Sequence, residues 1–538
     1  MAYFSQAHIC QCLTSLSTAR QKSIVSIFAD RVLTGKQFAD RVWRLSLGLL
    51  NLGIEPDDVV AICAFNSDWY LVWLLAVTFI GGILAPLNYR WSSKEAKWAL
   101  NTVRPVMLIT DESCISWNVD ISLSFLKWRI FLEPSRFHTG KHQITTENLM
   151  TNIKEPNGKN SYTFSRDSAA IICFTSGTTG KAKGVVLSHS SLIIQSLAKV
   201  AAVGYCENDV YLHTTPLCHV GGLSSALALL MVGGCHIMFP RFEPNAAVDA
   251  IGRHSVTSLI TVPAIMADIL SVSASARHAS VTKILNGGGS LSAELLSLAA
   301  DCFPRATILS AYGMTEACSS ITFMPLQTPN AQSTSIRFKE ERETHARGVC
   351  VGKPAPHVEV NLSSDGRILV RGPHVMLRYY SEPALGQSWL DTGDIGSIDS
   401  LGNLWLIGRA NGRIKTGGEN VYPEEVEIVL LSHPGLTAAV VVGIPHPRLS
   451  EMVVACIKVR EGWEWADRGN KFGSDRDMVL SDEVLKFHCR EKNLSRFKIP
   501  VKFFLWEKPF PMTSSGKIKR DEVQDDIVCL PQMPRSCL

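Results

Sequence analysis

Short runs of four to six mostly apolar residues recur along this chain, at residues 59–64, 169–174, 184–187 and 259–262. Such runs are typical of strands that are buried on both faces of a parallel sheet. Segments with helical spacing lie between them, and the first of these follows Thr34, a residue type that begins helices. This alternation predicts an α/β fold in which helices cover parallel sheets.

The composition is that of a globular protein with a large core. Of the 538 residues, 46% are hydrophobic and 19% are charged, which excludes a disordered chain. The 53 Lys and Arg residues barely exceed the 49 Asp and Glu residues, so the chain lacks the basic excess of nucleic-acid-binding proteins. Its 15 cysteines are scattered without any C-x-x-C pair. We therefore expect reduced, buried thiols, without a zinc site or a disulfide framework.

One uncharged stretch, residues 70–89, is long enough to span a bilayer. Glycines at 81 and 82 and a proline at 86 interrupt it. We expect a buried helix over residues 73–80, a glycine turn, and a strand over residues 83–87, and no membrane span. The first residues also lack the basic start and apolar run of a secretory signal.

A domain boundary is predicted near residues 408–412. Short β-like segments precede it, and after it Pro423 follows Tyr422 at a position that suits the first turn of a helix. Two acidic residues, Glu424 and Glu425, come next and favour the same helix start. We therefore predict two domains, residues 1–410 and an α+β domain over residues 411–538.

The segment that carries the most chemistry directly follows the apolar run at residues 169–174. Glycine, serine and threonine allow a loop to fold tightly, so that backbone N–H groups and hydroxyls converge on an anion. The segment differs from the common P-loop because no Ser or Thr follows its first lysine and a strand comes next. We predict a phosphate-binding loop formed by Thr175, Ser176, Gly177, Thr178, Thr179, Gly180 and Lys181, and continued by Ala182, Lys183 and Gly184.

This loop resembles the phosphate loop of the adenylate-forming acyl-CoA ligases, the family of firefly luciferase and 4-coumarate–CoA ligase. Further motifs of that family follow in family order along nearly the whole chain. They are Pro216-Leu217-Cys218-His219-Val220-Gly221-Gly222, Asn286-Gly287-Gly288-Gly289, Ala311-Tyr312-Gly313-Met314-Thr315-Glu316, Trp389-Leu390-Asp391-Thr392-Gly393-Asp394, Gly408-Arg409, Lys415-Thr416-Gly417-Gly418-Glu419-Asn420 and Gly516-Lys517.

The resemblance implies a fold and a two-step reaction. It implies a large N-terminal domain with two α/β subdomains and a β-barrel-like subdomain, followed by a small mobile C-terminal domain. In the family reaction a carboxylate attacks the α-phosphate of ATP to give an acyl adenylate and pyrophosphate, and a thiol then displaces AMP. Because an anion approaches a polyanion, fixed donors and Mg²⁺ must offset the repulsion. ATP, Mg²⁺ and coenzyme A are the expected small-molecule partners.

By the same resemblance, the N-terminal motifs would bind the nucleotide, the metal and the acid. Glu316, beside Thr315, would hold Mg²⁺, which prefers oxygen ligands. Tyr312 would stack near adenine. The glycines Gly287, Gly288 and Gly289 would let the backbone approach the nucleotide and the acyl group. His219 would contribute to the acyl site, although a purely structural histidine is the alternative.

The remaining motif residues would act near or beyond the boundary. Asp394 would accept hydrogen bonds from the ribose hydroxyls, and Arg409 would reach the ribose or a phosphate. Lys517 resembles the lysine that bridges the carboxylate and the α-phosphate during adenylation. Lys415, Gly417 and Gly418 would line the site during thioester formation instead. The two steps imply a rotation about a hinge.

Two positions depart from the family pattern. Asn411 stands at the hinge where Asp or Lys is frequent, and its Asn-Gly sequence accepts unusual backbone angles. Ala182 stands where many relatives have proline, which removes no phosphate-binding group.

A closer resemblance concerns the acid. Several segments resemble the plant branch of this family that activates 2-succinylbenzoate on the route to phylloquinone. They are Asn66-Ser67-Asp68, Ala85-Pro86-Leu87-Asn88-Tyr89-Arg90-Trp91, His219 to Ser225, and Gly417 to Pro423. This acid keeps one carboxylate as an anion, so its pocket needs a polar or cationic group. His219, Ser224 and Ser225 are the candidates for this role. The alternative is another peroxisomal acid–CoA ligase, acting on a cinnamate, a fatty acid or a jasmonate precursor.

The chain ends are also informative. Ser536-Cys537-Leu538 resembles a weak form of the peroxisomal address, which predicts contact with a peroxisomal import receptor. The first 29 residues contain several serines and loosely resemble a plastid transit peptide. Both the peroxisome and the chloroplast remain expected locations. Neither a non-catalytic relative nor a phosphotransferase is favoured, because the motif residues are intact and no Walker-type Gly-Lys-Ser/Thr occurs.

Overall fold

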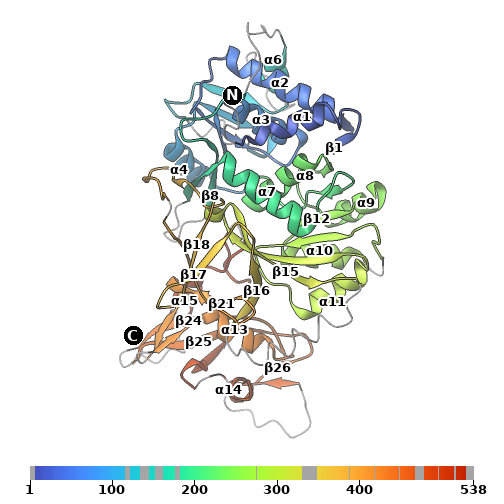
Figure 1. Cartoon of the computed structure of the whole chain (residues 1–538). Helices are drawn as coiled ribbons and strands as arrows, with labels where there is room; N and C mark the ends of the chain where they lie inside the picture. The colour runs from blue at the N-terminus through green and yellow to red at the C-terminus, as the bar shows by residue number, and fades with distance from the viewer. Residues whose placement is uncertain are drawn as a thin grey trace. The chain divides into compact units, whose positions relative to one another are not determined.

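The chain forms two compact units (Figure 1). The first comprises Met1–Ser335, Val351–Val360 and Val370–Leu390, and the second comprises Ile336–Cys350, Asn361–Leu369 and Asp391–Leu538. The predicted division into residues 1–410 and 411–538 describes a hinge between two moving domains, and it stays a prediction. The computed structural model describes residues 7–114, 122–133, 144–151, 162–175, 182–273, 276–329, 348–386, 388–416, 419–446, 449–466, 478–492, 494, 496–513 and 516–528.

The first unit contains two sheets. In one sheet the strands β1, β11, β10, β12, β13 and β14 lie parallel in this spatial order, and β2, β15 and β16 add antiparallel strands at its two sides. The bounds are β1 (Ile24–Phe28), β2 (Arg31–Thr34), β10 (Val210–Leu212), β11 (Cys235–Met238), β12 (Ser258–Thr261), β13 (Lys283–Asn286), β14 (Thr307–Met314), β15 (Ser319–Gln327) and β16 (Val349–Pro354).

The other sheet has the strand order β19-β9-β8-β4-β3-β5-β6-β7. From β8 to β7 it is parallel, and β9 and β19 continue it antiparallel. The bounds are β3 (Val59–Cys63), β4 (Ile83–Pro86), β5 (Met107–Thr110), β6 (Trp128–Phe131), β7 (Ile144–Thr145), β8 (Ala169–Thr175), β9 (Lys183–Ser188) and β19 (Arg378–Tyr379). The apolar runs of the sequence are thus strands of two largely parallel sheets, as predicted.

Helices fill the space between the two sheets and cover their outer faces. The helices α3 (Asp68–Phe79) and α7 (His189–Val203) each pack against strands of both sheets, and α8 (Val220–Val232) lies beside α7 (Figure 1). The other helices of this unit are α1 (Cys12–Ser17), α2 (Gly35–Asn51), α4 (Ser93–Val103), α6 (Thr146–Met150), α9 (Pro244–His254), α10 (Pro263–Ser273) and α11 (Ala293–Cys302). The predicted α/β class is confirmed.

Local sequence signals account for the helix starts. A capping box between Thr34 and Gln37 begins α2, as the sequence predicts. The helix expected at residues 73–80 begins earlier, at Asp68, because the Ser67 hydroxyl caps it by accepting from the N–H of Tyr70. No helix among the described residues is long and apolar enough to cross a membrane.

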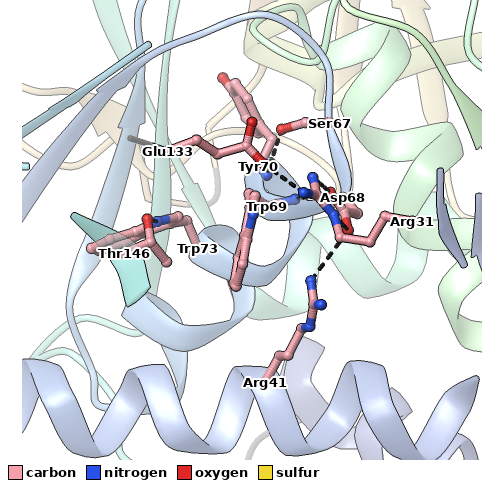
Figure 2. Close-up of polar contacts among 9 residues, drawn as sticks. All are labelled: Arg31, Arg41, Ser67, Asp68, Trp69, Tyr70, Trp73, Glu133 and Thr146. Atoms are coloured by element: carbon pink, nitrogen blue, oxygen red, sulfur yellow. Dashed lines mark hydrogen bonds and ion pairs between the residues drawn. The ribbon is translucent and has the colours of Figure 1, made fainter. Parts of the chain in front are cut away.

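Asp68 is also the centre of a buried charge network that the sequence did not reveal (Figure 2). Its two carboxylate oxygens each lie 2.6 Å from a guanidinium nitrogen of Arg31, and Arg41 lies 3.4 Å away. Arg31 also pairs with Glu133. Two arginines thus compensate a fully buried carboxylate at the start of α3, as a buried charge requires.

Two expectations need correction. Cys63 and Cys114 form a disulfide, so the expectation of reduced thiols throughout is wrong for this pair. Their 51-residue separation gives no sequence signal, but β3 and β5 are parallel neighbours, which brings the two chain segments together. In addition, residues 134–166 are rich in Thr, Asn, Lys and Ser, which predicts a solvated loop, but β7 and α6 form within them. Buried Thr146 of α6 accepts a hydrogen bond from Trp73 Nε1 at 3.0 Å (Figure 2).

The second unit contains the hairpin of β20 (Leu390–Ile398) and β21 (Leu404–Arg409), and an α+β module of the predicted kind. Helices α13 and α14 pack on one face of the module's sheet, and α15 packs on the other. The module's elements are β22 (Ile414–Thr416), β23 (Glu419–Val421), α13 (Pro423–Leu431), β24 (Leu436–His446), β25 (Ser450–Val459), β26 (Glu464–Trp465), β27 (Val479–Leu480), α14 (Asp482–Glu491), β28 (Lys502–Leu505) and α15 (Arg520–Val528). Strands β17 (Glu359–Leu362) and β18 (Arg367–Arg371) each contain residues of both units.

Candidate active site

The glycine motif lies at the carboxyl end of β13, between the neighbouring parallel strands β12 and β14. The N–H of Gly287 donates to the Thr261 carbonyl at 3.0 Å, and the Asn286 side chain donates to the Gly289 carbonyl at 2.7 Å. Gly288 has a φ of +70°, a left-handed conformation that favours glycine. α/β folds bind ligands at the carboxyl edge of their parallel strands. At this edge the glycines leave the backbone uncovered by side chains.

The neighbouring strand β14 brings in the next motif. Its register with β13 pairs Asn286 with Ser310, so half-buried Tyr312 follows at the same edge as the glycines. A β-bulge separates Tyr312 from Gly313, and a Cβ on Gly313 would lie 1.6 Å from the Ser319 carbonyl oxygen. Only glycine allows β14 and β15 to approach so closely, and this fixes the turn that follows.

That turn is the 3-10 helix η3 (Thr315–Ala317), which presents Glu316. The Glu316 side chain is buried, and its Oε1 accepts a hydrogen bond from the Tyr379 hydroxyl at 3.0 Å. Burial, with Glu316 as a further cause, raises the pKa of Tyr379, so this hydroxyl stays a donor at neutral pH. Tyr379 belongs to β19 and pairs with Val185 of β9. The sequence analysis did not single out Tyr379.

The predicted phosphate loop joins β8 to β9. Thr175 ends β8, and its register partner is Lys183 at the start of β9. The Lys183 ammonium lies 4.4 Å from the centre of the Tyr379 ring, and the Ala182 carbonyl accepts a hydrogen bond from Trp98 Nε1 at 3.3 Å. Both ends of the loop are therefore fixed beside the Glu316–Tyr379 pair. The other predicted loop residues, Ser176, Gly177, Thr178, Thr179, Gly180 and Lys181, lie outside the described residues.

His219 occupies the N-cap position of α8, in the motif that follows β10, and its side chain makes no capping hydrogen bond. The Asn66 side chain holds this turn, because Nδ2 donates to the Thr215 carbonyl at 2.9 Å and Oδ1 accepts from the Leu217 N–H at 2.8 Å. Burial, with a smaller contribution from Arg90, lowers the pKa of His219 to about 4. The imidazole is therefore neutral at pH 7.

Ser224 and Ser225, which are expected to contribute to the acid pocket with His219, contact a buried lysine. Lys199 Nζ donates to Ser224 Oγ at 2.6 Å and to Ser225 Oγ at 3.0 Å. The sequence does carry a signal for this lysine, because Lys199 follows Leu192 by seven residues on the inward face of α7.

In the second unit, two residues that are predicted to bind the nucleotide lie side by side. Asp394 on β20 pairs in register with Arg409 on β21, and Arg409 Nε lies 2.8 Å from Asp394 Oδ1. Asp394 is buried, whereas the Arg409 side chain is half exposed. A carboxylate held in this way suits hydroxyl donors of a ribose, while the exposed guanidinium suits an anion.

The C-terminal motifs lie in the same unit. Lys517 is exposed in a tight turn, where its N–H donates to Thr513 Oγ1 at 3.1 Å and its carbonyl accepts from the Thr513 N–H at 2.7 Å. Gly516, just before it, has a φ of +78°. Lys415 lies in β22 and Asn411 in the 3-10 helix Ala410–Gly412, whereas Gly417 and Gly418 lie outside the described residues.

Glycine loops at the carboxyl edge of a parallel sheet, beside a buried carboxylate and a hydroxyl-rich loop, define a nucleotide-binding α/β enzyme. Residues 16–380 match the family model of the AMP-binding enzyme, and residues 425–517 match the model of the AMP-binding enzyme C-terminal domain. The chain therefore belongs to the AMP-binding enzyme family.

Individual relatives extend this comparison. The chain is 51% identical to a 2-succinylbenzoate–CoA ligase, chloroplastic/peroxisomal, from Arabidopsis thaliana, with 100% of both chains covered. It is 28% identical to a 2-succinylbenzoate–CoA ligase from Bacillus subtilis (strain 168), covering 93% of this chain and 95% of the relative. It also resembles a solved o-succinylbenzoate CoA synthetase from Bacillus subtilis in complex with its acyl-adenylate intermediate, with a TM-score of 0.76, 26% identity and 97% and 98% coverage.

Proposed function

We propose that this enzyme joins 2-succinylbenzoate to coenzyme A, using ATP and releasing AMP and pyrophosphate, in phylloquinone formation. The observation that carries the proposal is the 51% identity over the full length of the Arabidopsis ligase. The site supports it, since the buried Glu316 carboxylate accepts from the Tyr379 hydroxyl, and Asp394 pairs with Arg409. A solved o-succinylbenzoate synthetase with ATP and magnesium has 26% identity and a TM-score of 0.76, which supports ATP and Mg²⁺ here.

In the first step, the chain must hold a polyanion while a carboxylate approaches the α-phosphate. The loop that begins at Thr175 would hold the β- and γ-phosphates with N–H groups and hydroxyls. Glu316 and Thr315 would supply oxygen donors to a Mg²⁺ shared with these phosphates, which is the usual setting for this ion. The Tyr379 hydroxyl orients the Glu316 carboxylate.

Lys517 would neutralise the oxygens of the carboxylate and α-phosphate as the adenylate forms. Lys517 is exposed and follows Gly516, which has a left-handed φ of +78°. Asp394 would accept hydrogen bonds from the ribose hydroxyls, and Arg409 would contact the ribose or a phosphate. Tyr312 would stack on adenine while Gly288 and Gly289 would let the backbone approach the nucleotide.

In the second step, the thiolate of coenzyme A would displace AMP from the acyl carbonyl. Lys415, Gly417 and Gly418 would line the site at this stage, after a rotation at Asn411. His219, neutral at pH 7, would contribute a ring nitrogen at the acyl end of the site without adding charge.

We also propose a location in the peroxisome or the chloroplast, because the Arabidopsis relative is named for both. The expected contact of Ser536-Cys537-Leu538 with an import receptor falls outside the described residues and stays a prediction.

A substrate panel with ATP, Mg²⁺ and coenzyme A tests the function. We expect pyrophosphate release and a thioester of the correct mass with 2-succinylbenzoate, at a kcat/KM well above that for 4-coumarate, a fatty acid or a jasmonate precursor. Omitting coenzyme A should leave the acyl adenylate. Preference for one of the other acids would refute the assignment of the substrate while keeping the reaction class.

A further inference from the structure

A lysine is buried between the two sheets of the first unit without a carboxylate partner. Lys199 is fully buried on α7, and its ammonium contacts three oxygens, namely the hydroxyls of Ser224 and Ser225 and, at 3.3 Å, the Gly221 carbonyl. Within the part of the chain that the structure describes, no Asp or Glu forms an ion pair with it. Three neutral acceptors satisfy the N–H groups but do not balance the charge.

Two other lysines with little solvent exposure are each paired with a carboxylate. Lys283 lies 2.7 Å from Asp209, and Lys498 lies 2.6 Å from Glu425. An ammonium that is removed from water without an opposite charge is strongly disfavoured, and burial accordingly lowers the pKa of Lys199 to about 7. A structural role in packing would not require a cation at this position, because Met or Leu would fill it at lower cost.

The position of Lys199 connects it to the candidate acyl site. Ser224 and Ser225 lie in the second turn of α8, the helix whose N-cap residue is His219. Ser224 Oγ donates to the Val220 carbonyl at 2.7 Å, so its lone pairs are free to accept from Lys199.

Open space lies beside the third partner. Gly221 is partly exposed, and a Cβ placed on it would meet only Ile260 Cδ1, at 4.0 Å. Ile260 precedes Thr261, whose carbonyl holds Gly287 of the glycine motif. Lys199 thus contacts the first turn of α8, and this turn faces Ile260 of β12. A four-carbon side chain can move its ammonium group by the length of one hydrogen bond toward Gly221.

We propose that Lys199 is the specificity-determining counter-ion for the second carboxylate of the substrate, the one that is not activated. This inference rests on the proposed function. Adenylation converts one carboxylate into an uncharged acyl group, but the other stays an anion through both steps and needs an opposite charge where water is excluded. An ammonium held by Ser224 and Ser225 and lacking a protein carboxylate supplies the opposite charge, and the pair forms only when the dianionic acid is bound.

Matched acids and variants test this proposal. The mono-acids 3-benzoylpropionate and 2-butanoylbenzoate each retain one of the two carboxylates of 2-succinylbenzoate. Whichever of these two mono-acids the wild-type enzyme converts serves as the comparison acid. For Lys199→Met we expect kcat/KM for 2-succinylbenzoate to fall about 10²- to 10³-fold, as when one member of a buried charge pair is lost. For the mono-acid we expect less than a threefold change. ATP binding, measured by calorimetry, should be unchanged.

Lys283→Met is the matched control, because it removes a partly buried, ion-paired lysine from the end of β13 that lies opposite the glycine motif. It should reduce thermal stability without changing the ratio of kcat/KM between the two acids. Should Lys199→Met fail to fold, Ser225→Ala carries the same test and should lower kcat/KM for the dianionic acid alone, about three- to tenfold.

Two results have separate meanings. If Lys199→Met, or Ser225→Ala in its place, lowers kcat/KM equally for both acids, or for neither, the counter-ion role is wrong. If the wild-type enzyme does not act on 2-succinylbenzoate at all, the proposed function itself fails.

Discussion

The Tyr379 hydroxyl lies 3.0 Å from Oε1 of Glu316, and this hydrogen bond links the two sheets of the first unit. Tyr379 pairs with β9, which leaves the predicted phosphate loop, whereas Glu316 follows β14, which carries Tyr312. The bond therefore sets the position of the proposed metal-binding carboxylate relative to the start of β9.

Replacing Tyr379 with Phe removes that donor and keeps the ring. A hydrogen bond to a charged group contributes about 1.5–3 kcal/mol. We expect the Mg²⁺ concentration for half-maximal pyrophosphate release to rise roughly tenfold or more, because the carboxylate loses its orientation. Tyr380→Phe is the control, since Tyr380 packs against an apolar core cluster. An unchanged Mg²⁺ dependence in Tyr379→Phe would show that the bond is only structural.

Replacing Asp394 with Asn removes the negative charge that faces Arg409 and the proposed ribose contact. We expect KM for ATP to rise about 10- to 100-fold, with a smaller effect on KM for the acid. The measurement is initial-rate kinetics with each substrate varied. Asp391→Asn, on the same strand and paired with Arg367 at 2.6 Å, should leave KM for ATP nearly unchanged. Equal effects of the two variants would argue against a ribose contact.

Replacing Lys517 with Ala separates the two half-reactions. Adenylate formation should fall at least about 10³-fold, because fixed positive charge no longer offsets the developing negative charge. Thioester formation from supplied acyl adenylate should be largely retained. Lys519→Ala, two residues away and paired with Glu522 at 2.7 Å, is the matched control. If Lys517→Ala loses both half-reactions equally, the proposed division of labour between Lys517 and Lys415 is incorrect.

Buried histidines predict a loss of stability in acid. His213 and His236 are fully buried and share a 2.9 Å hydrogen bond, and burial lowers the pKa of His236 to about 3. The unfolded chain, with a histidine pKa near 6.5, therefore binds more protons than the folded chain between about pH 6.5 and pH 3. Stability must fall as the pH falls through this window, by about 1.4 kcal/mol per pH unit for each such histidine.

Thermal unfolding at pH 7.5 and pH 5.0 measures this effect. We expect a lower Tm at pH 5.0, and a smaller difference between the two Tm values in His236→Gln, which keeps a polar side chain without a titrating group. Identical differences in both proteins would show that His236 does not contribute to the acid sensitivity.

Patterns within short segments were readable without coordinates. The apolar runs predicted β3, β8, β9 and β12, because a strand that is buried on both faces has apolar side chains at successive positions. Start signals such as Thr34 and Pro423 predicted helix starts for the same local reason. The sequence resemblance also identified the family, which the comparisons confirm.

Contacts between distant segments were not readable in this way. The pairing of Cys63 with Cys114 depends on two parallel strands lying side by side, and the contact of Tyr379 with Glu316 depends on one strand from each sheet. Neither pair is linked by a local spacing rule. The contact of Ser224 and Ser225 with Lys199 was likewise missed, because Lys199 lies on another helix.

The amino-acid sequence alone thus determined the family, the α/β class and the identity of the chemical groups, because those properties follow from local composition and order. The tertiary structure decided which groups meet: it placed an uncompensated ammonium beside the first turn of α8 and a tyrosine against Glu316. Electrostatic interactions depend on the distance through space and on the exclusion of water, and both are fixed only when separate strands and helices pack together.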